Sequence, residues 1–156
     1  MLATEELIQV GFSLHQEGKL EEAEKAYKQA LAQDSDNAEI YNLLGVLKLQ
    51  QKDVISAVNF VEKAVEKQPN AYFYETLFQT YIRAKLYKEI VKRAQEVLKK
   101  FPNDFSLMFN LALAYKNLKR NKEAINFYER ALKIDPSSYD AWFNLSHLYS
   151  VEAQTN

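Results

Sequence analysis

The segment "EEAEKAYKQAL" at residues 21–31 returns in modified form as "KEAINFYERAL" at residues 122–132. Both copies carry Ala, Tyr, Ala and Leu at the same places, and they begin 101 residues apart. That distance equals three steps of about 33 or 34 residues, so two further copies fit between them. The spacing predicts a chain built from one repeated unit.

Each unit reads as two helices joined by a short turn. Residues 7–14 and 20–31 both carry apolar residues at i, i+3, i+4 and i+7, which is one face of an α-helix. Gly18 lies between them and is free to adopt the positive φ of a tight turn. "AQDSDN" at residues 32–37 ends the second helix and offers caps for a third. The first helix is expected to bury Leu7, Val10, Gly11 and Leu14.

The unit recurs to the end of the chain. Pro69, Pro102 and Pro136 are 33 and 34 residues apart and follow the second helices, which proline would terminate. In the third copy Phe78 replaces the small residue of the first helix and Ala94 replaces the aromatic of the second. This exchange of large and small residues predicts an altered angle between those two helices.

The repeated pattern resembles the tetratricopeptide repeat (TPR) family, whose period is about 34 residues. The match is clearest in "DFSLMFNLALAYKNLKRNKEAINFYERALKIDPSS" and in "YDAWFNLSHLYS". The resemblance implies an all-α fold, an α-solenoid of about 4.5 helix-turn-helix repeats in a right-handed superhelix. We therefore expect a single TPR domain over residues 1–156. Its repeats would cover residues 4–37, 38–70, 71–104 and 105–138, with a half-repeat at 139–152.

Composition narrows the functional classes. The 156 residues carry a formal net charge of −1 and no cysteine, so neither a strongly basic surface nor a thiolate site is available. The first residues, "MLATEELIQVG", lack the features of a signal peptide, and no run is long enough to span a membrane. We expect a cytoplasmic protein.

Catalytic and metal sites are not predicted. His15 and His147 stand alone, and no Gly-rich phosphate loop is present. The sequence therefore predicts that the chain is not an enzyme. It also predicts no cofactor, no metal and no nucleic-acid partner. Residues 83–100 hold seven basic and two acidic residues, and residues 1–40 hold three basic and nine acidic ones. Either a solvated surface, an acidic partner or a head-to-tail contact would account for this asymmetry.

A binding face is expected on the first helices, opposite the core stripe. Stacked helix pairs form an extended concave surface, and in proteins of this kind an extended peptide or a protein partner occupies it. Exposed apolar groups rimmed by polar ones mark such sites, although contacts with the adjacent helix pair would account for some of them. The predicted peptide-binding residues are Ile8, Phe12, Asn42, Leu43, Val46, Tyr72, Gln79, Arg83, Phe109, Asn110, Leu113, Asn117, Phe143, Asn144 and His147.

Two further hypotheses concern the C-terminal part. Asn110 and Asn144 occupy equivalent places, which resembles the asparagine ladder of O-GlcNAc-transferase superhelices and implies backbone recognition of a peptide. The last helix, with Trp142 and Tyr149, lacks its usual partner, which favours self-association or coverage by further sequence. The function predicted is a protein-interaction scaffold. The alternative is the TPR region of a larger enzyme such as a glycosyltransferase, serving substrate recognition or oligomerisation.

Overall fold

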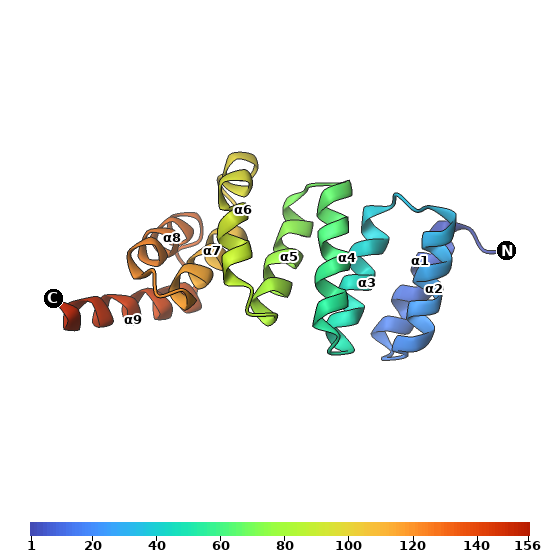
Figure 1. Cartoon of the computed structure of the whole chain (residues 1–156), viewed down its shortest axis with the longest axis horizontal. Helices are drawn as coiled ribbons and strands as arrows, with labels where there is room; N and C mark the ends of the chain where they lie inside the picture. Colours follow the sequence, from blue (N-terminus) through green and yellow to red (C-terminus); the bar gives the residue numbers. More distant parts are fainter. The chain divides into compact units, whose positions relative to one another are not determined.

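The computed structural model describes all 156 residues as α-helices joined by short turns (Figure 1). The prediction of an all-α chain of helix-turn-helix repeats is confirmed. The helices are α1 (Thr4–Gln16), α2 (Leu20–Gln33), α3 (Ala38–Gln50), α4 (Val54–Lys67), α5 (Ala71–Arg83), α6 (Tyr87–Lys100), α7 (Phe105–Asn117), α8 (Asn121–Ile134) and α9 (Tyr139–Thr155).

The chain divides into two compact units, Met1–Thr80 and Tyr81–Asn156, and the boundary falls inside α5. In the N-terminal unit α1 packs on α2 and α3 packs on α4. In the C-terminal unit α7 packs on α8, and α9 also packs on α8. Each unit therefore repeats the same hairpin of two helices.

Short polar residues begin most of the first helices. The side chains of Asn37, Asn70, Asp104 and Ser138 each accept a hydrogen bond from the backbone N–H three residues later, at 2.8–3.3 Å. These contacts satisfy N–H groups that have no partner inside the helix. The local sequence thus determines where each hairpin begins.

The turn within each hairpin uses one left-handed residue. Gly18 has φ of 78°, and the residues at the same place in later repeats are Lys52, Lys85 and Lys119, with φ of 62°, 58° and 62°. Sequence reasoning identified the glycine and missed the lysines, because lysine carries no turn preference of its own. The available signal was their spacing, since Gly18, Lys52, Lys85 and Lys119 follow one another at steps of 34, 33 and 34 residues.

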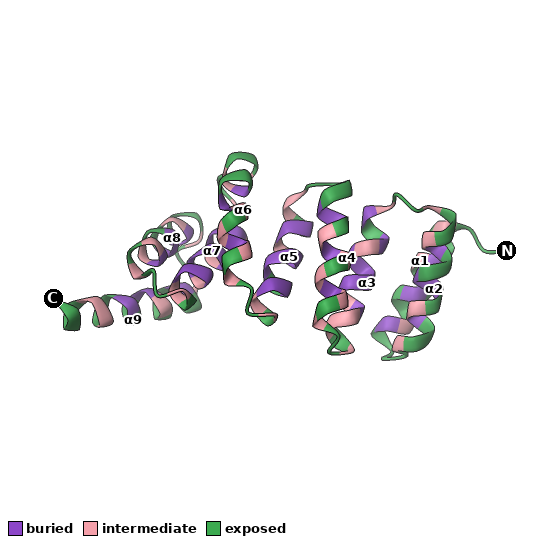
Figure 2. Ribbon diagram, viewed as in Figure 1, coloured by how far each residue is buried: buried purple, intermediate pink, exposed green.

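The two helices of a hairpin approach closely where small residues face large ones. A Cβ atom on Gly11 would lie 2.6 Å from the ring of Tyr27, and one on Gly45 would lie 2.3 Å from Cγ2 of Val61. Buried residues accordingly form stripes along each helix (Figure 2). Val10 corrects the sequence-based core, since 42% of it is exposed, whereas its equivalent Leu44 is fully buried. Val10 lies on the first helix, which no earlier hairpin covers.

Candidate functional site

In the N-terminal unit, exposed aromatic side chains lie on first helices at predicted positions. Phe12 of α1 is 47% exposed and Tyr72 of α5 is 56% exposed. Gln79 is also exposed, whereas Ile8 and Val46 are partly buried. Large apolar groups that remain this accessible contribute little to the core and are available to a partner.

Two predicted residues of α3 lie elsewhere. Asn42 is fully buried and Leu43 is 7% exposed, so neither is accessible on the surface. Ile8 also packs against the core cluster of Leu7, Tyr27 and their neighbours. The helical-wheel argument was wrong here because the buried stripe of an interior helix is wider than the four positions assigned to it.

The C-terminal unit carries the remaining predicted residues. Arg83, Asn117, Phe143 and His147 are exposed, and Leu113 is partly buried. Phe143 of α9 is 61% exposed and stacks on Tyr139, with ring centroids 6.1 Å apart and planes inclined by 22°. An exposed stacked pair presents a continuous apolar surface of two rings.

Phe109 has a different environment although it lies at the position equivalent to Phe143. It packs edge-on against Tyr128 of α8, with ring centroids 5.5 Å apart, and stacks on Phe105 at 5.9 Å. Phe109 was predicted to lie on the peptide-binding face, and its ring is instead partly covered within its own hairpin. Its ring belongs partly to the α7–α8 interface.

The two asparagines of the predicted ladder are already engaged or buried. Asn110 is only 7% exposed. Asn144 Oδ1 accepts a hydrogen bond from Lys116 Nζ at 2.6 Å, and its Nδ2 donates to the carbonyl of Asp140 at 2.8 Å. A peptide backbone would have to displace the lysine to use the carboxamide of Asn144.

In the N-terminal unit the buried Tyr27 interacts with two other titratable groups, His15 and Glu39. The Tyr27 hydroxyl lies 3.3 Å from Nδ1 of His15, and burial, with a smaller effect of the Glu39 charge, raises the pKa of Tyr27 to about 12. Burial also raises the pKa of Glu39. A tyrosine hydroxyl is already neutral at physiological pH, and the raised pKa extends this neutral range further. No set of three or more His, Asp or Glu residues gathers into a metal site.

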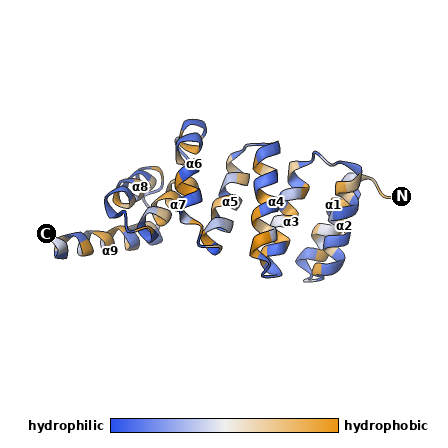
Figure 3. Ribbon diagram, viewed as in Figure 1, coloured by the Kyte–Doolittle hydropathy of each residue, from blue (hydrophilic) through white to orange (hydrophobic).

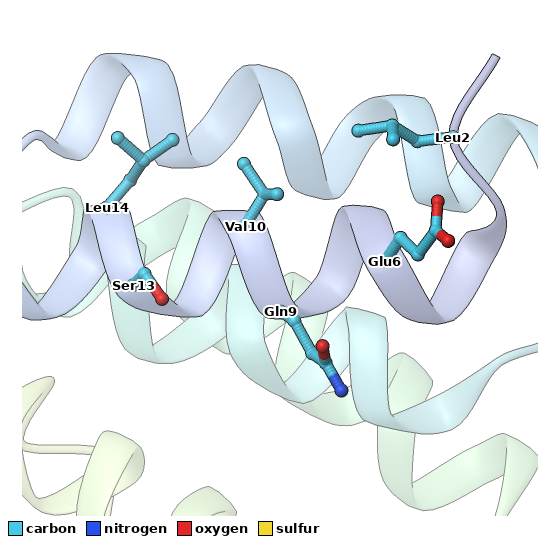
Figure 4. Close-up of a pocket in the computed structure, with 6 residues that line it drawn as sticks. All are labelled: Leu2, Glu6, Gln9, Val10, Ser13 and Leu14. Atoms are coloured by element: carbon cyan, nitrogen blue, oxygen red, sulfur yellow. The ribbon is translucent and has the colours of Figure 1, made fainter.

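Sequence reasoning missed an open apolar pocket of about 590 Å³ on the uncovered side of α1. Leu2, Val10 and Leu14 line it together with the polar Glu6, Gln9 and Ser13 (Figure 4). No helix of the chain is long and apolar enough to cross a membrane.

Comparison with known proteins identifies the class. Tetratricopeptide repeat models match residues 38–70, 106–138 and 127–156, and a further TPR repeat model matches residues 11–52. Together with the helix hairpins described above, these matches show that the chain belongs to the tetratricopeptide repeat family. Proteins of this family are α-solenoids. Repeats of this family form scaffolds for protein–protein interaction.

One curated relative is the human protein O-mannosyl-transferase TMTC3. It is 30% identical over 138 residues, which is 85% of this chain and 15% of the relative. The chain therefore spans only a small part of that protein's length.

Solved structures share the fold at low sequence identity. MamA protein superposes with a TM-score of 0.86 at 20% identity, over 96% of this chain and 82% of the other. YrrB, described as a TPR protein with an unusual peptide-binding site, gives 0.78 at 22% identity, over 94% and 76%. PilF of Pseudomonas aeruginosa gives 0.82 at 21% identity, over 97% and 69%. At this identity the likeness concerns the fold alone.

Proposed function

We propose that the chain is a protein-interaction module that binds an extended peptide segment across its first helices. The observation that carries this proposal is the exposure of Phe12 and Tyr72 at predicted positions of two first helices in one unit. Aromatic anchors contribute most to the affinity of such contacts, and exposed polar neighbours such as Gln79 supply hydrogen bonds at the rim. In this proposal the chain acts by binding, and not by catalysis.

The proposed site differs from the sequence-based set in its membership. Asn42, Leu43 and Asn110 are left out because they are buried, and Ile8 and Phe109 act mainly as supports. We propose further that residues 1–156 act as a single TPR domain with the repeat boundaries given above, located in the cytoplasm. YrrB, which shares the fold, is a protein with a peptide-binding site, and this is consistent with the proposal.

A phage-displayed library of peptides tests the proposal. Peptides selected on the unmodified chain are measured by fluorescence anisotropy against Phe12→Glu, Tyr72→Glu and a control, Ile55→Glu. Ile55 is a matched control because it is 79% exposed but lies on α4, a second helix. We expect the first two variants to weaken binding by about tenfold or more, and the control to leave it unchanged. Binding lost only in Ile55→Glu would refute the proposal.

A second candidate function is the repeat region of a longer glycosyltransferase, where it would recognise substrate or mediate oligomerisation. The identity to TMTC3 favours it. An antibody against this chain, used on extracts of its native source, tests the idea by the mass it detects. A single band at the 18.1 kDa of the present sequence would contradict this candidate, and a much larger band would support it.

A further inference from the structure

Four side chains of the C-terminal unit form a stack between α7 and α8. The ring of Tyr115 on α7 lies nearly parallel to the ring of Phe127 on α8, with centroids 5.4 Å apart and planes inclined by 6°. Cζ of Arg120 lies over the Tyr115 ring, 4.8 Å from its centroid. Cζ of Arg130 lies over the Phe127 ring, 4.9 Å from its centroid. Each guanidinium is therefore held by attraction to the face of a ring.

The two guanidinium groups differ in what their N–H groups bind. Nε and Nη2 of Arg120 both donate to Oε1 of Glu123, at 3.0 and 2.7 Å. Arg130 makes no hydrogen bond and no ion pair within the chain. Stacking uses the face of a guanidinium and leaves its edge free, and that edge carries N–H donors in the planar arrangement that matches a carboxylate. One guanidinium of the stack thus holds a carboxylate, whereas the other presents its donors unused.

The acidic residues of α8 do not serve Arg130. Glu129, its neighbour in the sequence, accepts a hydrogen bond from the Tyr149 hydroxyl of α9, and Glu123 is occupied by Arg120. The positions three and four residues from Arg130 in either direction lie beside it on the helix surface, and none is acidic. These positions hold Asn126, Phe127, Lys133 and Ile134. The donor edge of Arg130 therefore has no anion of its own helix to bind.

The surroundings of Arg130 indicate the chemistry of a ligand. Lys133 is exposed and adds a second positive charge three residues further along the helix. Ile134 is 39% exposed, so an apolar side chain borders the two cations. Asn126 is exposed one turn before Arg130 and supplies an amide. Figure 3 colours most of α8 as hydrophilic, and this surface is thus polar and cationic with one apolar neighbour.

We infer that Arg130 anchors a docking surface for an acidic segment of a partner protein, and that its guanidinium binds a carboxylate of that segment. Arg120 and Glu123 make the same kind of contact within the stack. A second carboxylate of the segment suits Lys133, and an apolar side chain of the segment suits Ile134. The net charge of −1 on the whole chain does not favour an anionic membrane as the partner. The surface lies on a second helix, so the inference does not depend on the proposed peptide site.

The side chain of Arg130 also covers part of the Phe127 ring. Covering the ring requires only contact between the side chain and the ring. Binding a carboxylate requires the positive charge and the N–H donors of the guanidinium. The two roles are therefore separated by observing these donors and by removing them.

Nuclear magnetic resonance observes the donors directly, because each arginine Nε–H gives its own nitrogen–proton signal and the chain has four arginines. The probe is the synthetic peptide acetyl-Glu-Glu-Leu-amide, and the control peptide is acetyl-Gln-Gln-Leu-amide. We expect the glutamate peptide to shift the Arg130 signal in a saturable way at millimolar concentration, and the glutamine peptide to leave it unchanged. The Arg120 signal is an internal reference that should not move, because Glu123 already accepts from its Nε–H.

Three variants of the full chain are compared through the backbone amide signals of residues 126–134. Arg130→Gln removes the charge and the planar donors and should weaken binding of the glutamate peptide by about tenfold. Arg130→Lys keeps the charge without the planar donors and should weaken it by a smaller factor. Lys122→Gln is the matched control, because it removes one exposed charge from the same helix and should leave binding unchanged. Circular dichroism verifies the helix content, and Arg130→Lys decides the outcome if Arg130→Gln loses helix.

Several results would overturn the inference. Absence of any shift of the Arg130 signal at millimolar peptide, or an equal shift with the glutamine peptide, would show that no carboxylate is recognised. Unchanged affinity in a folded Arg130→Gln would show that the side chain only covers Phe127. Inorganic phosphate that binds more tightly than the glutamate peptide would identify a phosphate site in place of a surface for an acidic segment.

Discussion

Replacing Asn42 by leucine should stabilise the fold, because the side chain of Asn42 is buried without a hydrogen bond. Asn42 lies in the middle of α3 with no exposed surface, and neither its Nδ2 nor its Oδ1 has a partner. At the equivalent positions of α1 and α7 the chain carries Ile8 and Phe109, which pack on their hairpins. An apolar residue therefore suits this position in two sister repeats.

The size of the gain follows from desolvation. A buried polar group without a partner costs about 1–3 kcal/mol, and leucine removes this cost. Leucine has the same branched arrangement of four side-chain heavy atoms as asparagine, but its two methyl groups are larger than the carboxamide oxygen and nitrogen, so overpacking against neighbours should cost about 1 kcal/mol. Leucine also has the better helix propensity, worth a few tenths of a kcal/mol. We expect a net gain of about 1–2 kcal/mol in the free energy of unfolding.

Urea denaturation followed by circular dichroism measures this gain as a higher midpoint at constant slope. Asn59→Leu is the matched control, because Asn59 is exposed in the middle of the paired helix α4. The control should change stability by no more than about 0.5 kcal/mol. A midpoint for Asn42→Leu at or below that of the unmodified chain would refute the argument and show that the carboxamide of Asn42 is satisfied in solution.

Three other changes probe the hairpins by the same denaturation assay. Gly45→Ala should cost about 1–2 kcal/mol, since its Cβ would lie 2.3 Å from Val61 and helix propensity returns only about 1 kcal/mol; an unchanged midpoint would contradict this. Lys52→Gly should gain up to about 1 kcal/mol, because a left-handed residue at φ of 62° favours glycine; a loss would count against it. Burial tends to raise the pKa of Glu24, but hydrogen bonds from lysines, among them Lys48 at 2.9 Å, outweigh burial and lower the pKa to about 2. The stability that Glu24 contributes is thus present above about pH 4.5 and is lost as the pH falls towards 2. In Glu24→Gln the free energy of unfolding should therefore fall less between these pH values, by up to about 3 kcal/mol.

Much of the fold could be predicted because its signals are local. The apolar spacing, the prolines at 33 and 34 residues, and capping residues such as Asp104 each act within one or two turns of helix. They determine the hairpins without reference to distant contacts. The altered angle expected from Phe78 and Ala94 stays a prediction, although both residues are buried as required.

The candidate site was less predictable because exposure depends on neighbours that a helical wheel does not contain. Val10 and Leu44 share one position, yet the first is exposed and the second is buried, since only α3 has a preceding hairpin. Asn110 was assigned to the surface because it lies opposite the core stripe on a helical wheel, and it is buried. Position on a helical wheel therefore predicted the exposed residues less well than the place of each helix among its neighbours would have done.

A comparison of Phe109 with Phe143 tests whether the exposure of a residue depends on the neighbouring helices. They share one position, but Phe109 contacts Tyr128 of the second helix in its hairpin, whereas Phe143 has no such helix and is 61% exposed. Phe109→Ala should therefore lower the free energy of unfolding by about 2–4 kcal/mol, and Phe143→Ala by less than about 1 kcal/mol. Equal losses in the two variants would contradict this reasoning, because they would mean that the side chain of Phe143 is covered in the single chain.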